Sequence, residues 1–520
     1  MGFLADVGHV WRLTHVGWVL AREGALAPVP VNALPVFARL PMRLAQSLAR
    51  RHASGALAKA VARLGPSYVK LGQFLATRPD IAGPRLAKEL SSLQDKMMPF
   101  SQAEAIAAVE TAFDQKLDTL FTSFGPPIAA ASIAQVHKAQ VLENGEIKDV
   151  AVKIARPDVE RRFRRDLGDM YFAARLAARF LPDADRLQPV LVVDTLARSV
   201  TLEMDFRLEA AAASEFAENT KQDVDFRVPS VDWTRTAKNV LTLEWVEATS
   251  LSDLAALRQR ELDLPKLGQT LIQNFLRHAV RDGFFHADMH QGNLMVDPEG
   301  RIVAVDFGIM GRQGPNERRF LAEILYGFIT RDYTRVAEVH IEAGYVPVQH
   351  SVADFAQAIR AVGEPIHSKT ADQISMAKLL TLLFEITALF DMKTRPELVM
   401  LQKTMVVVEG VARTLDPQLN MWKTAEPVVK DWIMQNLGPA GKLQDAGRGL
   451  QHLGRTLADV PDFFDRAKNV LASLDAAIKT GFSLSAESLS GIGKAEARRA
   501  RWGNLALWVI AAALAWRVWH

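Results

Sequence analysis

Residues 284–311 read FFHADMHQGNLMVDPEGRIVAVDFGIMG, and three polar residues stand out among the apolar ones. Asp288 is followed five positions later by Asn293, and Asp306 comes after two apolar runs, 294–296 and 302–305. Turn residues at 297–300 separate these runs, which predicts two short strands around a tight turn. Such a hairpin can bring Asp288, Asn293 and Asp306 into one pocket. Three oxygen donors there would suit Mg²⁺ holding a polyphosphate, because Mg²⁺ prefers hard oxygen ligands.

Length and composition limit the remaining possibilities. A chain of 520 residues is long enough for about three domains. Because 49% of the residues are hydrophobic and the net charge is only +3, we expect neither disorder nor a nucleic-acid partner. The absence of cysteine excludes disulfides, thiolate zinc sites and a cysteine nucleophile. We expect no secretory signal, although the arginines of the first fifty residues resemble those of an organellar transit sequence.

The order of patterns along the chain predicts a two-lobed α+β protein. Residues 52–122 have helical spacing, and residues 128–154 have strand character around the turn ENGE at 143–146. Helical patterns return at 158–217, VLTLEWVE at 240–247 predicts another strand, and most of the chain after residue 251 is helical. The small strand region therefore comes first and the helical region second, with the carboxylates at their junction.

Lys153 is the second candidate for chemistry. It lies in VAVKI, where alternation along a strand turns it away from Val152 and Ile154. A lone lysine in a strand is usually solvated, but here a run of small residues precedes it. Backbone amides of such a run can approach phosphate oxygens, which the lysine of the next strand can also reach, as in protein kinases. The run and the residue that ends it are Ala129, Ala130, Ala131, Ser132, Ile133, Ala134 and Val136.

Six motifs together resemble the UbiB family of atypical kinase-like proteins, which are associated with ubiquinone biosynthesis. VAVK at 150–153, HADMHQGN at 286–293 and DFG at 306–308 are similar to the protein-kinase signature. AAASIAQVH at 129–137 stands where kinases have a glycine-rich loop, LEMDF at 202–206 resembles the ExD motif of the family, and VKLGQ at 69–73 resembles its KxGQ motif. The resemblance covers residues 66–311, and the helical C-lobe extends it to about residue 440.

This resemblance implies a role for each matching residue. Lys153 would contact the α- and β-phosphates of ATP or ADP and would pair with Glu209. Asp288 would occupy the catalytic position, and Asn293 and Asp306 would hold Mg²⁺. The hinge that meets adenine would include Glu244 and Val246. Ala287 replaces the usual arginine and no clear Ala-Pro-Glu follows the DFG, which argues against activation-loop control and peptide recognition.

The alanine-rich loop and the two extra motifs have physical consequences. Each alanine adds a Cβ that glycine lacks, so the loop should close less tightly over a γ-phosphate. The spacing of Leu64, Tyr68, Leu71 and Leu75 predicts one apolar helix stripe over residues 60–78, with Arg63, Lys70, Gln73 and Thr77 on the opposite face.

Within this segment Gly72 would allow close packing. In the ExD segment Asp205 and Glu209 are i, i+4 neighbours, which leaves Glu203 to pair with Lys70. The expected regulatory set is therefore Lys70, Gly72, Gln73, Glu203 and Asp205. The family's KxGQ segment lies across the peptide groove, so we expect residues 60–78 to gate the site.

Three classes of function stay open. The first is a UbiB-type atypical kinase or ATPase that supports ubiquinone synthesis at a membrane. The second is a small-molecule phosphotransferase of the aminoglycoside or choline kinase type, whose catalytic loop is also similar to HxDxHxGN. The third is a nucleotide-binding scaffold without transfer activity. The KxGQ and ExD segments favour the first class, for which water, a lipid, a prenylated phenol precursor and a protein all stay open as acceptors.

The C-terminus predicts a membrane anchor. WGNLALWVIAAALAWRVW at 502–519 would span roughly 27 Å as a helix, just under the ~30 Å hydrocarbon core of a bilayer. The preceding basic residues predict that the lobes lie on the cytoplasmic face of a bacterial inner membrane, in preference to a mitochondrial inner membrane. A soluble or interfacial helix is the alternative. Expected partners are membrane lipids and ubiquinone-biosynthesis proteins or phenol precursors, and a homodimer stays open.

These patterns predict six regions. They are a basic amphipathic segment at 1–51, which can add contact with anionic lipid, a helical KxGQ extension at 52–127, an N-lobe with inserted helices at 128–247, a helical C-lobe at 248–440, a polar tail at 441–500 and the anchor at 501–520.

Overall fold

The strand signals before residue 155 form an antiparallel sheet in the computed structural model. The structure describes residues 3–27, 31, 36–47, 55–76, 83–90, 93, 97–180, 188–367, 386, 389–392 and 396–438. Three strands follow in order and a fourth adds to their edge: β1 (Ser123–Ala130), β2 (Ala134–Glu143), β3 (Glu146–Ala155) and β5 (Val240–Glu244). The predicted turn at 143–146 is confirmed, since Asn144 and Gly145 have φ values of 54° and 85°. Positive φ at both central residues is what a two-residue type I′ turn requires.

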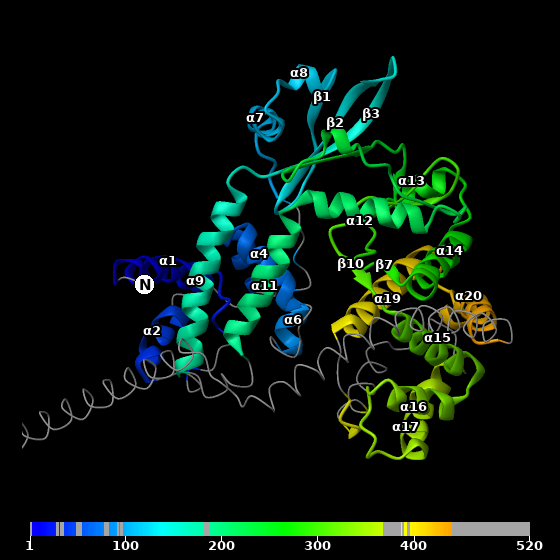
Figure 1. The fold of residues 1–520 in the computed structure, drawn as a ribbon. Helices are drawn as coiled ribbons and strands as arrows, with labels where there is room; N and C mark the ends of the chain where they lie inside the picture. Colours follow the sequence, from blue (N-terminus) through cyan, green and yellow to red (C-terminus); the bar gives the residue numbers. More distant parts are fainter. Residues whose placement is uncertain are drawn as a thin grey trace, which may run out of the picture. The chain divides into compact units, whose positions relative to one another are not determined.

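Alternation along β3 decides which face of the sheet each side chain occupies. Val152 and Ile154 pack on the side of helix α7 (Gln102–Phe113), which lies beside the sheet with the short α8 (Leu117–Leu120) (Figure 1). Because successive strand residues face opposite ways, Lys153 points toward the other core, which contains Phe206 of helix α12 (Phe206–Asn219). The lysine is therefore directed into the molecule and is not on a solvated face.

Two long helices are inserted between β3 and α12. These are α9 (Val159–Phe180) and α11 (Pro189–Glu203), which pack against each other. Asp205 ends the break between α11 and α12, because its side chain accepts a hydrogen bond from the N–H of Arg207 and so caps α12.

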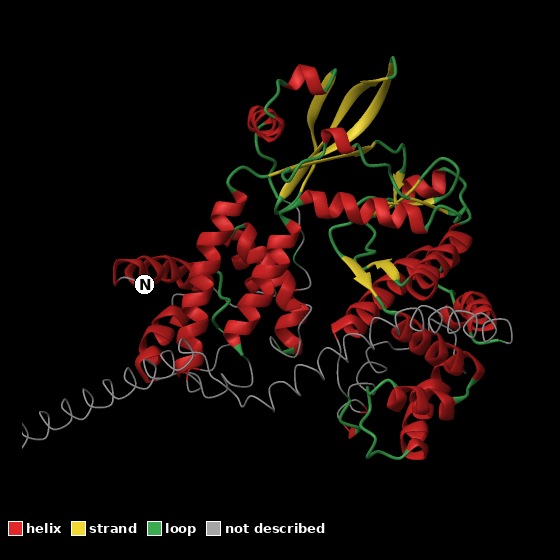
Figure 2. Ribbon diagram, in the orientation of Figure 1, coloured by secondary structure: helices red, strands yellow, loops and turns green. Residues whose placement is uncertain are grey.

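The described part of the chain after β5 is mostly helical (Figure 2). Its helices are α13 (Leu254–Gln259), α14 (Leu264–Arg277), the π-helical turn η3 (His278–Asp282), α15 (Pro315–Thr330), α16 (Tyr333–Glu342), α17 (Val352–His367), α19 (Pro396–Leu415) and α20 (Met421–Asn436). Short strands form two small sheets, β4 (Phe226–Arg227), β9 (Ile302–Ala304), β8 (Leu294–Val296) and β6 (Thr249–Ser250) in one, and β7 (Phe284–His286) with β10 (Met310–Arg312) in the other. Packing of α14 on α19 contributes to the main core of this lobe.

The helical extension is interrupted at Pro66, within the segment 60–78. Helix α3 (Ala56–Leu64) ends at Gly65, whose φ of 99° is unfavourable for other residues, and α4 (Pro66–Ala76) begins with a proline at its first position. The apolar spacing therefore continues across a helix boundary. Its residues are packed as expected, since Leu64, Tyr68, Leu71 and Leu75 all join hydrophobic clusters. In the described part of the chain, α1 (Phe3–Arg22) and α2 (Val36–Ser47) precede α3, and α6 (Pro84–Leu90) comes between α4 and α7.

The architecture is the expected α+β arrangement, with a sheet in the N-lobe and a helical C-lobe. The chain divides into two compact units, Met1–Ile433 and Met434–His520, and the first contains the elements that carry the candidate site. The membrane helix expected at 501–520 lies outside the described residues. Within the described ranges, no helix has both the length and the apolar character needed to cross a bilayer.

Candidate active site

Lys153 is held between two carboxylates. Its Nζ lies 2.7 Å from Oε1 and 3.0 Å from Oε2 of Glu209, and 3.3 Å from Oδ2 of Asp306. Its ammonium also lies 5.4 Å from the centre of the Phe206 ring. Burial alone would lower the pKa of Lys153, but Asp306 and Glu209 reverse that effect and raise it. The lysine is therefore a fixed positive charge at the junction of the two lobes.

Helix α12 brings Glu209 to this lysine. The helix starts at Phe206, so Glu209 lies in its first turn, where a carboxylate interacts favourably with the helix dipole. Glu209 is buried, and burial raises its pKa while the ammonium of Lys153 opposes the rise. The expected Lys153–Glu209 contact is thus present, although 56 residues separate the partners.

The catalytic-loop residues follow β7 and are held by local hydrogen bonds. The N–H of Asp288 donates to Nδ1 of His286 at 3.1 Å, and Nδ2 of Asn293 donates to the carbonyl of Asp288 at 3.1 Å. His286 is buried, which lowers its pKa, so a neutral ring with an unprotonated Nδ1 agrees with this contact. Because the amide nitrogen of Asn293 faces Asp288, its oxygen stays available to accept or to bind a cation.

Asp306 comes directly after the predicted hairpin, which is confirmed as β8 and β9. Its Oδ1 accepts a hydrogen bond from the N–H of Gly308 at 3.0 Å, while Oδ2 faces Lys153. Burial would raise the pKa of Asp306, but Lys153 and the Gly308 N–H hold it well below its usual range. The next residue, Phe307, is buried with its ring centre 5.8 Å from that of His286.

The alanine-rich loop is short and anchored. Ala129 and Ala130 belong to β1 and pair with Val136 and Gln135 of β2, so the turn itself is formed by residues 131–133. The N–H of Ala131 donates to the carbonyl of Ala134 at 2.8 Å, and Ser132, Ile133 and Ala134 are buried.

Arg156, a residue that the sequence did not indicate, holds this loop from behind. Its Nε donates to the Ala131 carbonyl and its backbone N–H to the Ile133 carbonyl, at 2.9 and 2.8 Å. Its Nη2 donates to the carbonyl of Met98, in the segment leading from the helical extension. An arginine directly after a strand and before Pro157 is the only signal that could have pointed to it.

The expected hinge follows β5. The N–H of Glu244 donates to the Ser230 carbonyl at 2.9 Å, and its carboxylate contacts Arg227. The backbone N–H of Trp245 donates to the carbonyl of Asp149 at 3.2 Å, and Val246 is buried. The Glu244 side chain is thus directed to Arg227, and only backbone groups of the hinge stay candidates for adenine.

The five residues expected to regulate the site separate into different environments. Nζ of Lys70 lies 2.7 Å from Oε2 of Glu203, and each side chain is only 15% exposed, so this pair is present. A Cβ on Gly72 would lie 2.4 Å from Leu93, which agrees with close packing at this glycine. Gln73 is half-buried on α4. Asp205 does not join this group, because its carboxylate binds Arg207.

The oxygens of Asn293 and Asp306 are the donors available for a divalent cation. Within the described ranges, no three acidic or histidine side chains come together as a metal cluster. Mg²⁺ needs no such cluster, since it usually takes one or two carboxylates together with phosphate oxygens and water. The ionised Asp306 carboxylate and the free amide oxygen of Asn293 therefore fit a nucleotide-bound Mg²⁺.

This fold and this contact set define a protein-kinase-like protein. Residues 92–340 match the ABC1 atypical kinase-like domain, and residues 359–420 match the UbiB helical domain. The chain belongs to the UbiB family of atypical kinase-like proteins.

Similar proteins agree with this assignment. "Probable protein kinase UbiB" of Marinobacter nauticus is 37% identical over 446 residues, covering 83% of this chain and 80% of the relative. The protein of the same name from Aeromonas hydrophila is 38% identical over 437 residues, covering 82% and 80%, and that from Vibrio cholerae is 36% identical over 444 residues, covering 84% and 81%. A solved structure titled as the complex of Rv3197 with erythromycin from Mycobacterium tuberculosis has a TM-score of 0.51 at 25% identity, covering 78% of this chain and 98% of that one.

Proposed function

We propose that this protein is a membrane-associated atypical kinase or ATPase that binds ATP or ADP with Mg²⁺ and supports ubiquinone biosynthesis. The observation that carries the proposal is Lys153, whose ammonium lies between Glu209 and Asp306 at 2.7 and 3.3 Å. One carboxylate is enough to balance the charge of the lysine. The second carboxylate, Asp306 of the DFG segment, supports a site in which Lys153 binds a phosphate and Asp306 binds its metal ion.

In this proposal each residue acts at a stated atom. Nζ of Lys153 contacts the α- and β-phosphates, and Glu209 keeps the lysine in place. Asp306 and the Asn293 oxygen hold Mg²⁺, which when bound neutralises phosphate charge. Asp288 orients the acceptor and takes its proton, because its backbone is fixed by His286 and Asn293.

The loop and the helical extension favour a small acceptor. Alanines at 129–131 restrict the backbone more than glycines, so the loop closes less tightly on the γ-phosphate. The Lys70–Glu203 pair supports the proposal that α4 occludes the groove where kinases bind peptides. Water, a lipid or a prenylated phenol precursor would then reach the site by another route.

The roles in ubiquinone biosynthesis and at the membrane are proposed from the family and from the sequence. The relatives carry the printed name UbiB, and the apolar stretch 502–519 is long enough to approach a bilayer span. The alternatives are a small-molecule phosphotransferase and a scaffold without transfer activity. The Lys70–Glu203 contact favours the UbiB-type reaction over the first, and the ionised Asp306 beside Lys153 favours it over the second.

Nucleotide hydrolysis by the full chain tests this proposal. The assay compares Mg²⁺ with EDTA, with and without candidate phenols and anionic vesicles. Asp306→Asn keeps the shape of the side chain and removes its charge, so hydrolysis should fall by about 100-fold or more and Mg²⁺-nucleotide binding should weaken. Glu299→Gln is the matched control, since that exposed carboxylate contacts only the neighbouring Arg301 among the described contacts. Unchanged hydrolysis in a folded Asp306→Asn protein would falsify the site assignment.

A further inference from the structure

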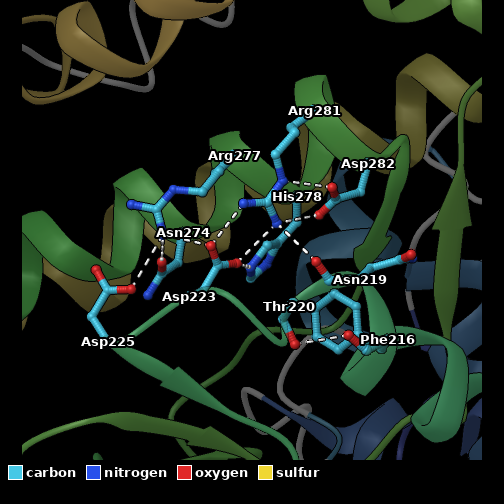
Figure 3. Close-up of polar contacts among 10 residues, drawn as sticks. All are labelled: Phe216, Asn219, Thr220, Asp223, Asp225, Asn274, Arg277, His278, Arg281 and Asp282. Atoms are coloured by element: carbon cyan, nitrogen blue, oxygen red, sulfur yellow. Dashed lines mark hydrogen bonds and ion pairs between the residues drawn. The ribbon is translucent and has the colours of Figure 1, made fainter.

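A cluster of charged side chains surrounds the buried Asp223 at the end of α12 that is farther from Lys153. Figure 3 shows Asp223, from the loop after α12, facing Arg277, His278 and Arg281 at the end of α14 and in η3. The Asp223 side chain is only 5% exposed. The cluster lies outside the set of residues expected to touch nucleotide or metal.

Asp223 is engaged through both carboxylate oxygens. Arg281 donates from Nη1 to Oδ1 at 2.7 Å and from Nη2 to Oδ2 at 2.9 Å, and His278 adds a contact from Nε2 at 3.2 Å. Two parallel bonds from one guanidinium fix the orientation of both groups. Burial would raise the pKa of Asp223, but His278 and Arg281 hold it well below its usual range. The contact is therefore an ion pair in surroundings that screen charge weakly.

Arg281 connects this carboxylate to α12 itself. Its Nη2 also donates to the carbonyl of Asn219, the last residue of α12, at 3.2 Å. Asp282 accepts hydrogen bonds from Nε and Nη2 of the same guanidinium at 2.6 and 2.7 Å (Figure 3). These bonds hold the Arg281 side chain in one orientation. The end of α12 is thereby fixed to η3.

The other end of α12 carries Glu209. Glu209, Ala213 and Phe216 are four and three residues apart, so they lie along one face of the helix. The ring centre of Phe216 lies 4.9 Å from that of His278 and 6.1 Å from that of Phe307 in the DFG segment. A shift of the helix at its far end would therefore move the contacts of both Phe307 and Glu209.

The same arginine precedes the catalytic loop. Gly283, with a φ of 66°, follows η3, and β7 comes next with Phe284–His286. Asp288 comes seven residues after Arg281. Arg318 of α15 further fixes this turn by donating to the Arg281 carbonyl at 2.6 Å. Arg281 thus contacts α12 and belongs to the segment that leads into the catalytic loop.

We propose that Asp223 and Arg281 are positioning residues that keep Glu209 and the catalytic loop in register. They touch neither nucleotide nor metal, and act by fixing the end of α12 to η3. This role rests on the proposed nucleotide chemistry, because it concerns the alignment of Lys153, Glu209 and Asp288 for that reaction.

Substitution of Asp223 tests the proposal in the full chain. Asp223→Asn should lower kcat for nucleotide hydrolysis by about 10- to 100-fold, since a misplacement of about 1 Å can cost about 100-fold. KM should change less than kcat, because the proposed hinge and alanine-rich loop, which also hold the nucleotide, are not part of this cluster. Asp225→Asn is the matched control, as Asp225 also contacts Arg277 but neither Arg281 nor His278 in the described contacts. If both variants behave alike, the proposal is wrong.

A double variant separates positioning from general destabilisation. In a Glu209→Gln background, Asp223→Asn should reduce activity by a smaller factor than it does in the wild type, because one of the two groups that it positions is already lost. Fully multiplicative losses would mean that the cluster acts on the whole fold. If Asp223→Asn does not fold, Arg281→Lys keeps the charge and removes the fork, and the same comparison applies.

Hydrogen exchange keeps this test separate from the proposed function. Asp223→Asn should accelerate amide exchange in residues 206–219 more than elsewhere in the C-lobe, whether or not the protein hydrolyses nucleotide. If the wild-type protein hydrolyses no nucleotide but the variant shows this local acceleration, the proposed function is contradicted. The proposal that Asp223 and Arg281 fix α12 to η3 is then still supported. Unchanged or uniformly faster exchange would overturn the proposal that Asp223 and Arg281 fix α12 to η3.

Discussion

Single residues determine the electrostatics of this molecule, and Lys153 is the clearest case. A buried ammonium is costly unless it is paired, and here two carboxylates compensate the loss of water. Of these, Glu209 lies deep in the fold while the Asp306 side chain is 42% exposed. The unequal exposure fits two different roles, in which the buried Glu209 holds the lysine and the more accessible Asp306 binds the ligand.

Asp223 gives a prediction about pH at the same scale. Its pKa is depressed in the folded protein, whereas an unfolded aspartate titrates near about 4. The ionised group therefore stabilises the fold above about pH 4, and this contribution is lost as pH falls further toward its folded pKa. Asp223→Asn should cost about 3 kcal/mol at neutral pH, because it breaks a buried pair.

Urea unfolding between about pH 7 and about pH 3 checks this sign. The difference in free energy of unfolding between wild type and Asp223→Asn should stay constant down to about pH 5 and shrink below about pH 4. Asp225→Asn, at a more exposed carboxylate, should show a smaller gap throughout. A gap that persists unchanged at the acid end would mean that Asp223 is not held ionised by its partners.

At the scale of helices and strands, local patterns predicted the elements that alternate or turn. The alternation of VAVKI directed Lys153 away from Val152 and Ile154, and turn residues located both hairpins. The spacing of Leu64 and Tyr68 predicted that both are packed, but it did not show the break between them, because spacing alone cannot detect a glycine with positive φ at Gly65.

Contacts made by distant residues could not be predicted from such patterns. Asp223 and Arg281 are 58 residues apart, and nothing in either segment indicates the other. Arg156 meets Met98 for the same non-local reason. Asp205 was expected to regulate through the cleft, but its nearest donor is Arg207, because a residue before a helix is used as its cap. The pair Lys70–Glu203 was found by elimination between two acids, which works only when few candidates exist.

Two glycines in helices give opposite predictions. A Cβ at Gly72 would lie 2.4 Å from Leu93 and 3.2 Å from Val61, so Gly72→Leu should overpack α4 and cost about 1–3 kcal/mol. Gly410 in α19 has open space at this position, so Gly410→Ala should stabilise by up to about 1 kcal/mol through helix propensity. Denaturant unfolding measures both. Equal effects of the two substitutions would contradict the packing that separates them.

At the scale of the whole molecule, membrane attachment depends on two parts of the chain. Deleting residues 500–520 should move the protein from the membrane to the soluble fraction, because the deletion removes the stretch 502–519. Helix α1 carries Trp11 and Trp18, which are 77% and 51% exposed and suit an interface. Full retention of the deleted protein would instead assign the anchoring to α1 or to a partner, and replacing both tryptophans by serine then separates those two.

Gating by α4 is a prediction that connects the helical extension, α11 and α12. Lys70 and Glu203 connect the helical extension to the end of α11, and α12 with Glu209 begins three residues after Glu203. Loss of this pair should therefore loosen α4 and disturb the start of α12. Because both side chains are mostly buried, the pair should stabilise more than the 0–1 kcal/mol typical of an exposed pair.

The experiment compares Lys70→Ala with Arg63→Ala, whose pair with Glu23 is 59% exposed on the arginine side. Lys70→Ala should raise autophosphorylation or change the preference between ATP and ADP, and Glu203→Gln should have the same effect because it removes the same attraction. Arg63→Ala should leave both properties near wild type. If Lys70→Ala equals wild type in nucleotide affinity, hydrolysis and autophosphorylation, the pair only fastens α4 to α11. The low activity toward peptides expected for this family would then have to come from the alanine-rich loop alone, and Ala→Gly changes at 129–131 would become the substitutions that restore it.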